Sequence, residues 1–300
     1  MKIGSTEIID TFAEAFRMRF VRLIITAHDD YWLSAAIQAF TGYASSVIAC
    51  DAEAALEHWI PQSETPDGRP GAAVLVFGFS VEALVKTVPR RAGQCLMTCP
   101  STAVFNGLPI GEETVPLGKH LRFFGDGFQK SKRLAGRRYW RIPVMDGEFV
   151  VEERLGVGKG VGGGNLILHA ATEEAGLAAS RRAVEAVAQM PGIITPFPGG
   201  VARSGSKVGS RYKGLIASTA DAYCPTLRGV VPTQIHPGAD YAYEIVMDGI
   251  DEAHIAEAMR RSLHAAVGEG LPAIGAGNYG GKLGKFHFRL SDILALGPTA

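Results

Sequence analysis

Length, composition and charge exclude several classes of protein. The chain has 300 residues, of which 47% are hydrophobic, so it is long enough for two ordinary domains and too apolar to be disordered. Thirty basic side chains balance thirty acidic ones, which leaves no basic field for nucleic acid, and no apolar run approaches the roughly 18 residues of a membrane-spanning helix.

The first half of the chain alternates strand-like and helix-like segments. Strands are expected at residues 18–26, 46–50, 72–79, 121–124 and 138–144. Asp29 or Asp30 can cap a helix that Gly42 ends, and Ser80 can cap a second helix that Pro89 kinks or ends. The order is strand, helix, two strands, helix, strand.

The second half repeats this order without detectable identity to the first. Strands are expected at residues 164–170, 192–195, 241–248, near 273 and at 286–290. Thr172 starts one amphipathic helix, and Asp251 caps another that ends at Gly268. Two β-α-β-β-α-β units predict an α+β chain of two ferredoxin-like lobes, residues 1–146 and 147–300, each with helices on one face of a largely antiparallel sheet.

Cysteine usage and the start of the chain favour the cytoplasm. The four cysteines are few and irregularly spaced, which is typical of free thiols in a reducing compartment: Cys50, Cys95, Cys99 and Cys224. Residues 1–10 hold no apolar core and no small-residue cleavage site of a signal peptide. We therefore expect a cytoplasmic protein.

Glycine-dense segments that also carry polar side chains recur along the whole chain. They are residues 67–71, 93–95, 125–127, 196–200, 204–210, 220–226 and 276–284. Glycine permits positive φ and lets a ligand approach the main chain closely. Ordinary hairpin turns need fewer glycines, so these segments are interpreted as walls of a binding site.

Other apparent motifs lack the context that their chemistry needs. The glycines at 158, 160 and 163 match a dinucleotide fingerprint, but the residues that follow read as strand where the fingerprint needs a helix. Residues 276–283 lack both the first glycine and the Ser/Thr of a phosphate loop, and the Cys95–Cys99 spacing is not that of a zinc site. With no recognisable histidine beside them, the cysteines do not indicate thioester chemistry.

Taken in order, these segments resemble one family, the formylmethanofuran–tetrahydromethanopterin formyltransferases. The resemblance runs from residues 10–16 (DTFAEAF) to residues 280–284 (GGKLG), nearly the entire chain. It implies two fused ferredoxin-like lobes, a homotetramer built as a dimer of dimers, and formyl transfer between the amine of methanofuran and N5 of tetrahydromethanopterin. It implies no metal or prosthetic group. Ala220 stands where the family pattern has Asn, which puts one polar contact in doubt.

The neutral composition is compatible with an aerobic methylotrophic bacterium, in which the family's enzyme works with a formyl hydrolase complex in formaldehyde oxidation. Two alternatives stay open. In the first alternative to a formyltransferase, the chain is a carrier-docking subunit whose chemistry occurs in a partner hydrolase. In the second, it is a formyl hydrolase by itself, although no metal cluster or histidine relay is visible in the sequence to activate water.

Glu244 is the candidate proton carrier. In the expected strand it shares a face with Ala242 and Val246, and a carboxyl buried among such neighbours has its pKa raised. The alternative from spacing alone is a solvent-facing Glu on the open side of the sheet. The matching Glu of the family is a proposed catalytic acid, which favours the functional interpretation.

Several further side chains are candidates for substrate contact. Gln94 and Asn278 offer amides to the formyl oxygen or the pterin, or they cap turns beside their neighbouring glycines. Asp221 and Tyr223, in the segment that matches the family, could orient the pterin. Asp126 is a candidate too, although its position between two glycines is more typical of a turn residue.

Three cations complete the predicted site. Arg69, Lys207 and Lys282 could meet the carboxylates of the methanofuran-type carrier or the acidic tail of the pterin. The alternative for each of them is a solvated loop charge.

Overall fold

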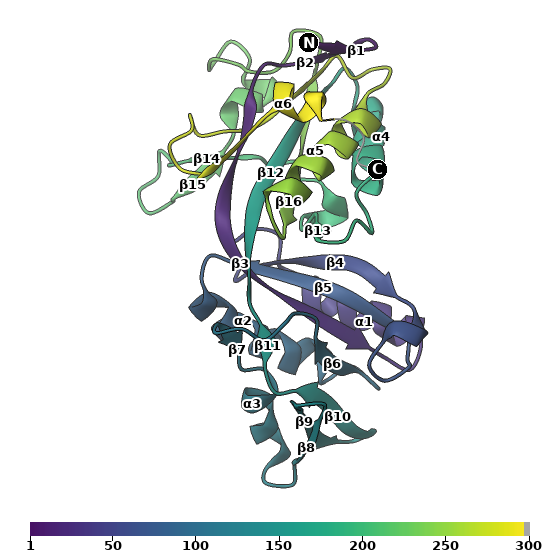
Figure 1. Ribbon diagram of the computed structural model, residues 1–300. Helices are drawn as coiled ribbons and strands as arrows, with labels where there is room; N and C mark the ends of the chain where they lie inside the picture. The colour runs from purple at the N-terminus through teal and green to yellow at the C-terminus, as the bar shows by residue number, and fades with distance from the viewer. Residues whose placement is uncertain (297–300) are drawn as a thin grey trace. The chain divides into compact units, whose positions relative to one another are not determined.

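The computed structural model describes residues 1–296, which form two compact units (Figure 1). The first unit consists of residues 18–160 and 189–194, and the second of residues 1–17, 161–188 and 195–296. The sequence predicts lobes at 1–146 and 147–300, and this division stays a prediction; the compact units are discontinuous in the chain. The reason is that two long strands, β3 (Phe12–Thr26) and β12 (Gly158–Ala170), each contribute residues to both units.

The first unit has the predicted ferredoxin-like order. Its elements are β3, α1 (Asp30–Thr41), β4 (Glu53–Ile60), β5 (Gly71–Gly78), α2 (Val81–Arg91) and β6 (Ala103–Asn106). The strands lie in the order β4-β5-β3-β6, and every neighbouring pair is antiparallel. The sheet continues through β10 (Gly147–Glu152), which is parallel to β6, to β9 (Arg137–Val144) and β8 (Lys130–Leu134).

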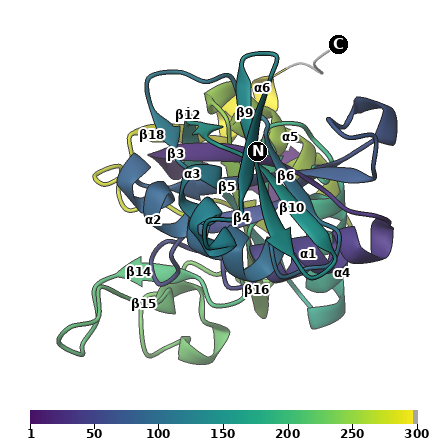
Figure 2. The same ribbon diagram turned by 90° about the horizontal axis from the view of Figure 1, so that it is seen from below.

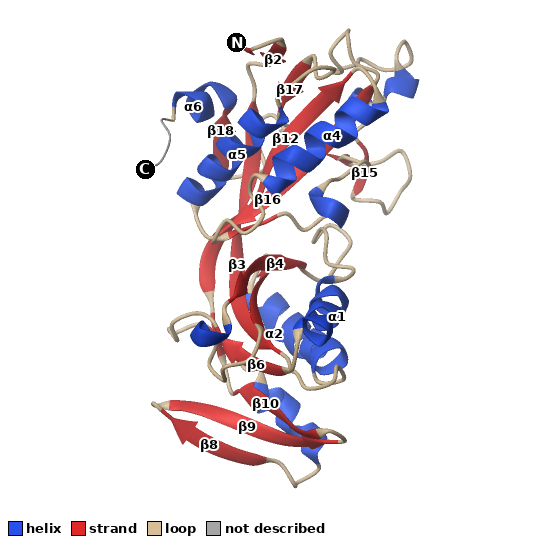
Figure 3. Ribbon diagram, turned by 90° about the vertical axis from the view of Figure 1, so that its right-hand side faces the viewer, coloured by secondary structure: helices blue, strands red, loops and turns tan. Residues whose placement is uncertain are grey.

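Helices α1 and α2 of the first unit pack on the same face of its sheet (Figure 3). Alternate residues of β3, namely Val21, Leu23 and Ile25, are fully buried in one core with Leu33 of α1 and Leu84 of α2. Period-two alternation on the strand and helical spacing on the helices therefore meet in one apolar layer.

Shorter elements complete the first unit. They are η1 (Gln62–Glu64), the π-helical turn η2 (Ala92–Leu96), β7 (Thr114–Val115), α3 (Gly118–Leu121), η3 (Arg122–Gly125), β11 (Leu155–Gly156) and β13 (Ile193–Ile194). The strand expected at 121–124 is wrong, because this segment is helical: the Leu117 carbonyl accepts from the N–H groups of His120 and Leu121.

The strand expected at 46–50 is also wrong. The Ser46 carbonyl accepts from the N–H groups of Ala49 and Cys50, so the chain turns there, and the strand begins only at Glu53. A short apolar run satisfies a strand pattern and a turn pattern equally well, and the local backbone bonds decided for the turn.

The second unit repeats the pattern around β12. Its main elements in chain order are β12, α4 (Glu173–Glu185), β16 (Tyr241–Gly249), α5 (Glu252–Ala266) and β17 (Ala273–Gly275); the short strand β13 lies between α4 and β16 in the chain but belongs to the first compact unit. Strand β12 lies between β16 and β17 and is antiparallel to both. The predicted fold class, α+β with largely antiparallel sheets, is confirmed. Strand β12 runs through the glycines at 158, 160 and 163, so the helix that a dinucleotide fingerprint needs does not follow them directly.

Other parts of the second unit come from both ends of the chain. Strand β1 (Lys2–Ile3) pairs with β2 (Thr6–Ile8), which lies parallel to β17, and β18 (Phe286–Arg289) pairs with the first residues of β3. The remaining elements are η4 (Pro198–Gly200), β14 (Ser206–Val208), β15 (Ala217–Thr219), η5 (Asp221–Tyr223), η6 (Pro225–Leu227) and α6 (Leu290–Ala295).

The predicted helix starts are confirmed by side-chain caps. Oδ1 of Asp29 accepts from the N–H of Trp32 at 3.1 Å, and Oγ of Ser80 accepts from Ala83 at 3.2 Å. Thr172 and Asp251 cap α4 and α5 in the same way. Pro89 lies inside α2, which continues to Arg91.

Helices and loops of the second unit occupy opposite sides of β12 and β16. Helices α4 and α5 lie side by side against these strands (Figure 3), and a Cβ at Gly164 of β12 would come within 2.5 Å of Ile255 Cγ2 of α5. The β14–β15 hairpin and the long loop beside it, coloured green in Figure 2, lie on the other side. No helix in residues 1–296 is both long and apolar enough to cross a bilayer. All four cysteines are free thiols.

Candidate active site

A pocket of about 270 Å³ lies on the loop-covered side of β12 and β16. Its walls come from these strands and from segments 202–207, 220–224 and 277–279, so three of the predicted glycine-rich stretches meet here. Five of the nine predicted site residues line it: Lys207, Asp221, Tyr223, Glu244 and Asn278. All of them belong to the second unit.

Strand β16 directs Glu244 to this pocket. Side chains of the strand alternate between two faces: Ile245 and Met247 are fully buried in the core, whereas Ala242 and Glu244 line the pocket. The backbone of Glu244 exchanges two hydrogen bonds with Ala202, with N···O distances of 2.8 and 2.9 Å. The strand therefore holds one pocket wall directly beside the carboxyl group.

The Glu244 carboxyl lies between two glycines. A Cβ at Gly205 would be 3.8 Å from Oε2, and a Cβ at Gly277 would be 3.7 Å from Oε1. Part of the side chain is accessible from the pocket, but protein surrounds the carboxyl densely, and within residues 1–296 no hydrogen bond or ion pair reaches it. Burial raises its pKa to about 7. The group is therefore able to give and take a proton near neutral pH.

Two tyrosines stand near this carboxyl. Burial raises the pKa of Tyr223, and the charge of Glu244 raises it further. The same two causes raise the pKa of Tyr279, whose side chain also hydrogen-bonds to Ser206. Both phenols therefore stay protonated at neutral pH and can act as hydrogen-bond donors.

Asn165 of β12 holds the third glycine segment, and sequence reasoning missed it. Its Oδ1 accepts from the N–H of Gly277 at 2.6 Å, and its Nδ2 donates to the carbonyls of Gly277 and Gly163 at 3.1 and 3.2 Å. An Asn directly before the apolar run of residues 166–168 was the available signal, because a buried amide needs partners.

Lys207 and Asp221 face each other as an ion pair at the pocket wall. The hydrogen bond from Lys207 is the main cause that holds the pKa of Asp221 below its usual range. The Lys207 charge is therefore already partly compensated before any substrate carboxylate arrives.

Asn278 makes the turn-capping contacts that its alternative interpretation predicts. Its Nδ2 donates to Thr11 Oγ1 and to the Phe12 carbonyl, both at 3.2 Å, and its Oδ1 accepts from the Gly280 N–H at 3.0 Å. It lines the pocket as well. Lys282, on the same loop, is exposed and does not line the pocket.

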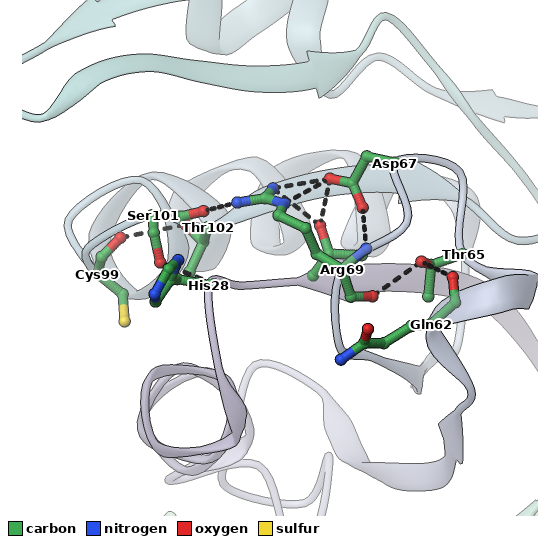
Figure 4. A network of polar contacts seen from close by, with 9 residues as sticks. His28, Gln62, Thr65, Asp67, Arg69, Cys99, Ser101 and Thr102 are labelled. Carbon is green, nitrogen blue, oxygen red and sulfur yellow. Dashed lines mark hydrogen bonds and ion pairs between the residues drawn. The ribbon is translucent and has the colours of Figure 1, made fainter.

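Arg69 belongs to the first unit, in a polar network within that unit (Figure 4). Its guanidinium donates to Asp67 Oδ2, to Thr26 Oγ1 at 3.0 Å and to the Ser101 carbonyl. These bonds tie the loop after β4 to β3 and to the turn at Ser101. The contacts are structural, and they use donors that a substrate carboxylate would need.

Gln94 and Asp126 also lie in the first unit. Gln94 is exposed on η2 and lines a separate, mostly apolar pocket of about 740 Å³ together with Met97 and Phe124. Asp126 ends η3 with φ 49° and is exposed, as expected of a turn residue.

Fold and pocket together define a two-unit α+β protein with a carboxyl of raised pKa in its pocket. Residues 1–144 match the model of the formylmethanofuran-tetrahydromethanopterin formyltransferase family, and residues 147–293 match the model of its proximal lobe. The chain belongs to this family, as its sequence segments predicted.

Individual relatives agree with this assignment. The formylmethanofuran–tetrahydromethanopterin formyltransferase of Methylococcus capsulatus is 53% identical over 299 residues, which cover 98% of this chain and 100% of the relative. One subunit of the formyltransferase/hydrolase complex of Methylorubrum extorquens is 47% identical, with 97% of each chain covered.

Two solved structures of the family have the same fold as this chain over nearly its whole length. The formyltransferase from Methanosarcina barkeri superposes with a TM-score of 0.92 at 44% identity, covering 98% of this chain and all of that one. The Methylorubrum extorquens formyltransferase/hydrolase complex, solved with methylofuran, contains a chain that superposes with a TM-score of 0.94 at 46% identity, covering 98% of both.

Proposed function

We propose that this chain transfers a formyl group between N5 of tetrahydromethanopterin and the amine of methanofuran, or of a methanofuran analogue, in one-carbon metabolism. The observation that carries the proposal is the buried Glu244 carboxyl, with its pKa of about 7, in the pocket of a chain that belongs to this family.

The reaction is an acyl transfer between two nitrogens. One amine forms a bond to the formyl carbon, the formyl oxygen becomes an oxyanion, and the bond to the other nitrogen then breaks. Glu244 gives its proton to the departing nitrogen and regains one from the attacking amine, so protons balance over the cycle. Holding both carriers side by side supplies up to roughly 7–11 kcal/mol of the barrier reduction, and a positioned acid supplies about 10²–10⁴-fold in rate.

The other pocket residues bind and orient the carriers in this proposal. Tyr223 and Asp221 orient the pterin, and Asn278 adds an amide at the pocket wall. Lys207 and the exposed Lys282 meet carboxylates of the carriers.

The candidates of the first unit are proposed for carrier binding as well. Gln94 has an exposed side chain and lines a pocket of its own. Asp126 is exposed too, whereas Arg69 has the weakest case because its donors are engaged.

Incubating the isolated chain with formyl-tetrahydromethanopterin and methanofuran tests the function directly. We expect formyl exchange. We expect Glu244→Gln to lose about 10²–10⁴-fold in kcat while it keeps its affinity for both carriers, because the carboxamide has nearly the same size but cannot give and take a proton near neutral pH. Glu174→Gln, at an exposed position of α4, is the control. Near-normal turnover of Glu244→Gln would remove Glu244 from the acid role.

A carrier-docking subunit is the second candidate function. The observation in its favour is that the Methylorubrum extorquens relative is a subunit of a formyltransferase/hydrolase complex. Under that proposal the isolated chain binds carriers but exchanges no formyl group until the partner subunits are added.

We also propose a cytoplasmic homotetramer arranged as a dimer of dimers, able to associate with formyl hydrolase subunits, in a methylotrophic bacterium. Free thiols at all four cysteines support a reducing compartment. No prosthetic group takes part in this proposal; both carriers are substrates.

A further inference from the structure

A second glutamate of the unit is held in the opposite way to Glu244. Glu14 lies on β3 and is only 1% exposed. Its Oε2 accepts from the N–H groups of Tyr279 and Gly281 at 2.7 and 2.8 Å, and its Oε1 accepts from those of Leu283 and Gly284 at 2.6 and 2.5 Å. One carboxylate thus binds four backbone donors of a single loop, residues 276–284.

These donors keep Glu14 charged. Burial by itself works to raise its pKa, but the N–H groups of Gly284, Tyr279, Leu283 and Gly281 outweigh burial and leave the pKa below its usual value. A buried carboxylate is tolerated when hydrogen bonds replace its water, so this ion and the loop require each other.

The same loop forms part of the pocket beside Glu244. Its residues 277–279 line the pocket, with Gly277 next to the Glu244 carboxyl. Asn165 holds the loop at Gly277, and Glu14 holds it from Tyr279 to Gly284. The approach is close: a Cβ at Gly284 would come within 2.6 Å of the Ala15 carbonyl oxygen.

We propose that Glu14 is a positioning residue, which fixes the loop 276–284 in the shape that packs Gly277 and Tyr279 around Glu244. The proposal rests on the function proposed above, because only there does the environment of Glu244 matter for catalysis. Glu14 itself touches no substrate. If its bonds are lost, the loop loosens, water reaches Glu244, and the acid loses the environment that raises its pKa.

Glu14→Gln tests this role. The carboxamide has the same size, but only its oxygen accepts, and its NH₂ faces two N–H donors. We expect the amides of Tyr279, Gly281, Leu283 and Gly284 to exchange hydrogen at least about tenfold faster. We expect the titration midpoint of Glu244, followed by carboxyl-carbon NMR, to fall below about 7, and kcat to fall by about 10- to 100-fold with a smaller change in KM.

Glu152→Gln is the matched control. Glu152 is 3% exposed and lies in the first unit, where it accepts from the N–H of Asn106 at 2.9 Å and from Arg137 Nε at 2.6 Å. Loss of this carboxylate should leave hydrogen exchange in the loop and the Glu244 midpoint as in the wild type.

Wild-type exchange in the loop together with a wild-type Glu244 midpoint in Glu14→Gln would overturn the proposal, and so would equal changes in the control. Glu14→Asp keeps the charge on a shorter side chain and should give intermediate values; it carries the test if Glu14→Gln does not fold. Exchange and titration need no turnover. A wild-type chain without formyl transfer would therefore count against the proposed function, while the two measurements still decide the role of Glu14.

Discussion

At the scale of single residues, two glutamates of one unit show how surroundings set the chemistry of a carboxyl group. Glu14 accepts hydrogen bonds from four backbone N–H groups, and these bonds hold its pKa below the usual value. Glu244 lies between glycines, and burial raises its pKa to about 7. The first is a fixed anion that organises a loop, and the second is an acid that can exchange a proton.

The raised pKa of Glu244 predicts a stability that depends on pH. Between about pH 4.3 and pH 7 the unfolded chain ionises Glu244 while the folded chain does not. The folded state then binds more protons, so the free energy of unfolding falls as pH rises through this window. The stabilisation is complete below about pH 4 and is lost above pH 7.

Glu244→Gln removes this titration. At pH 8 the variant should be more stable than the wild type by about 1–3 kcal/mol, and at pH 4 the two should be nearly equal. Urea unfolding at both pH values measures the difference, with Glu174→Gln as an exposed control. If the free energies of unfolding of the variant and the wild type differ by the same amount at pH 4 and pH 8, the raised pKa of Glu244 would be contradicted.

At the scale of elements, glycines let the helices of the second unit lie directly against its strands. A Cβ at Gly164 of β12 would come within 2.5 Å of Ile255 of α5, and a Cβ at Gly176 of α4 would come equally close to the Tyr243 ring of β16. Tyr243 precedes Glu244, so this packing also supports the strand that carries the acid.

Gly176→Ala should therefore destabilise the protein, although alanine is the better helix former. The gain in helix propensity is about 1 kcal/mol, whereas overpacking against Tyr243 and Ala170 costs about 1–3 kcal/mol. We expect a net loss of up to about 2 kcal/mol in urea unfolding. Leu177→Ala, at the neighbouring exposed position of α4, should change much less. A stabilised Gly176→Ala protein would show that α4 has room to move.

At the scale of the whole molecule, composition and surface favour assembly. The net charge is zero, so no long-range repulsion keeps copies apart. Phe123, Phe124 and Phe128 of the first unit are 67–77% exposed, and such a group of large apolar side chains is typical of surfaces that become covered.

Light scattering on the purified chain tests the proposed tetramer. The expected mass is about four times the 31.9 kDa of one chain, with transferase activity in the same fraction. A monomer of 31.9 kDa with full activity would contradict the tetramer.

The sequence by itself determined most elements and the family, because these depend on residues close together in the chain. Caps at Asp29, Ser80, Thr172 and Asp251 act within three residues, and the strand periodicity of 241–248 is equally local. The strand predictions at 46–50 and 121–124 were wrong, because segments this short carry too little periodicity to distinguish a strand from a turn or a helix.

Tertiary structure alone decided what surrounds each polar side chain. Asn165 is hydrogen-bonded to Gly277, which is 112 residues away in the chain, and Glu14 to Gly284, which is 270 residues away. No local sequence pattern predicts either hydrogen bond. The same holds for the burial of Glu244 and for the networks that occupy Arg69 and Asn278. Burial and hydrogen-bond partners exist only once distant segments pack together, and these two properties set the pKa of the acid and the shape of its pocket.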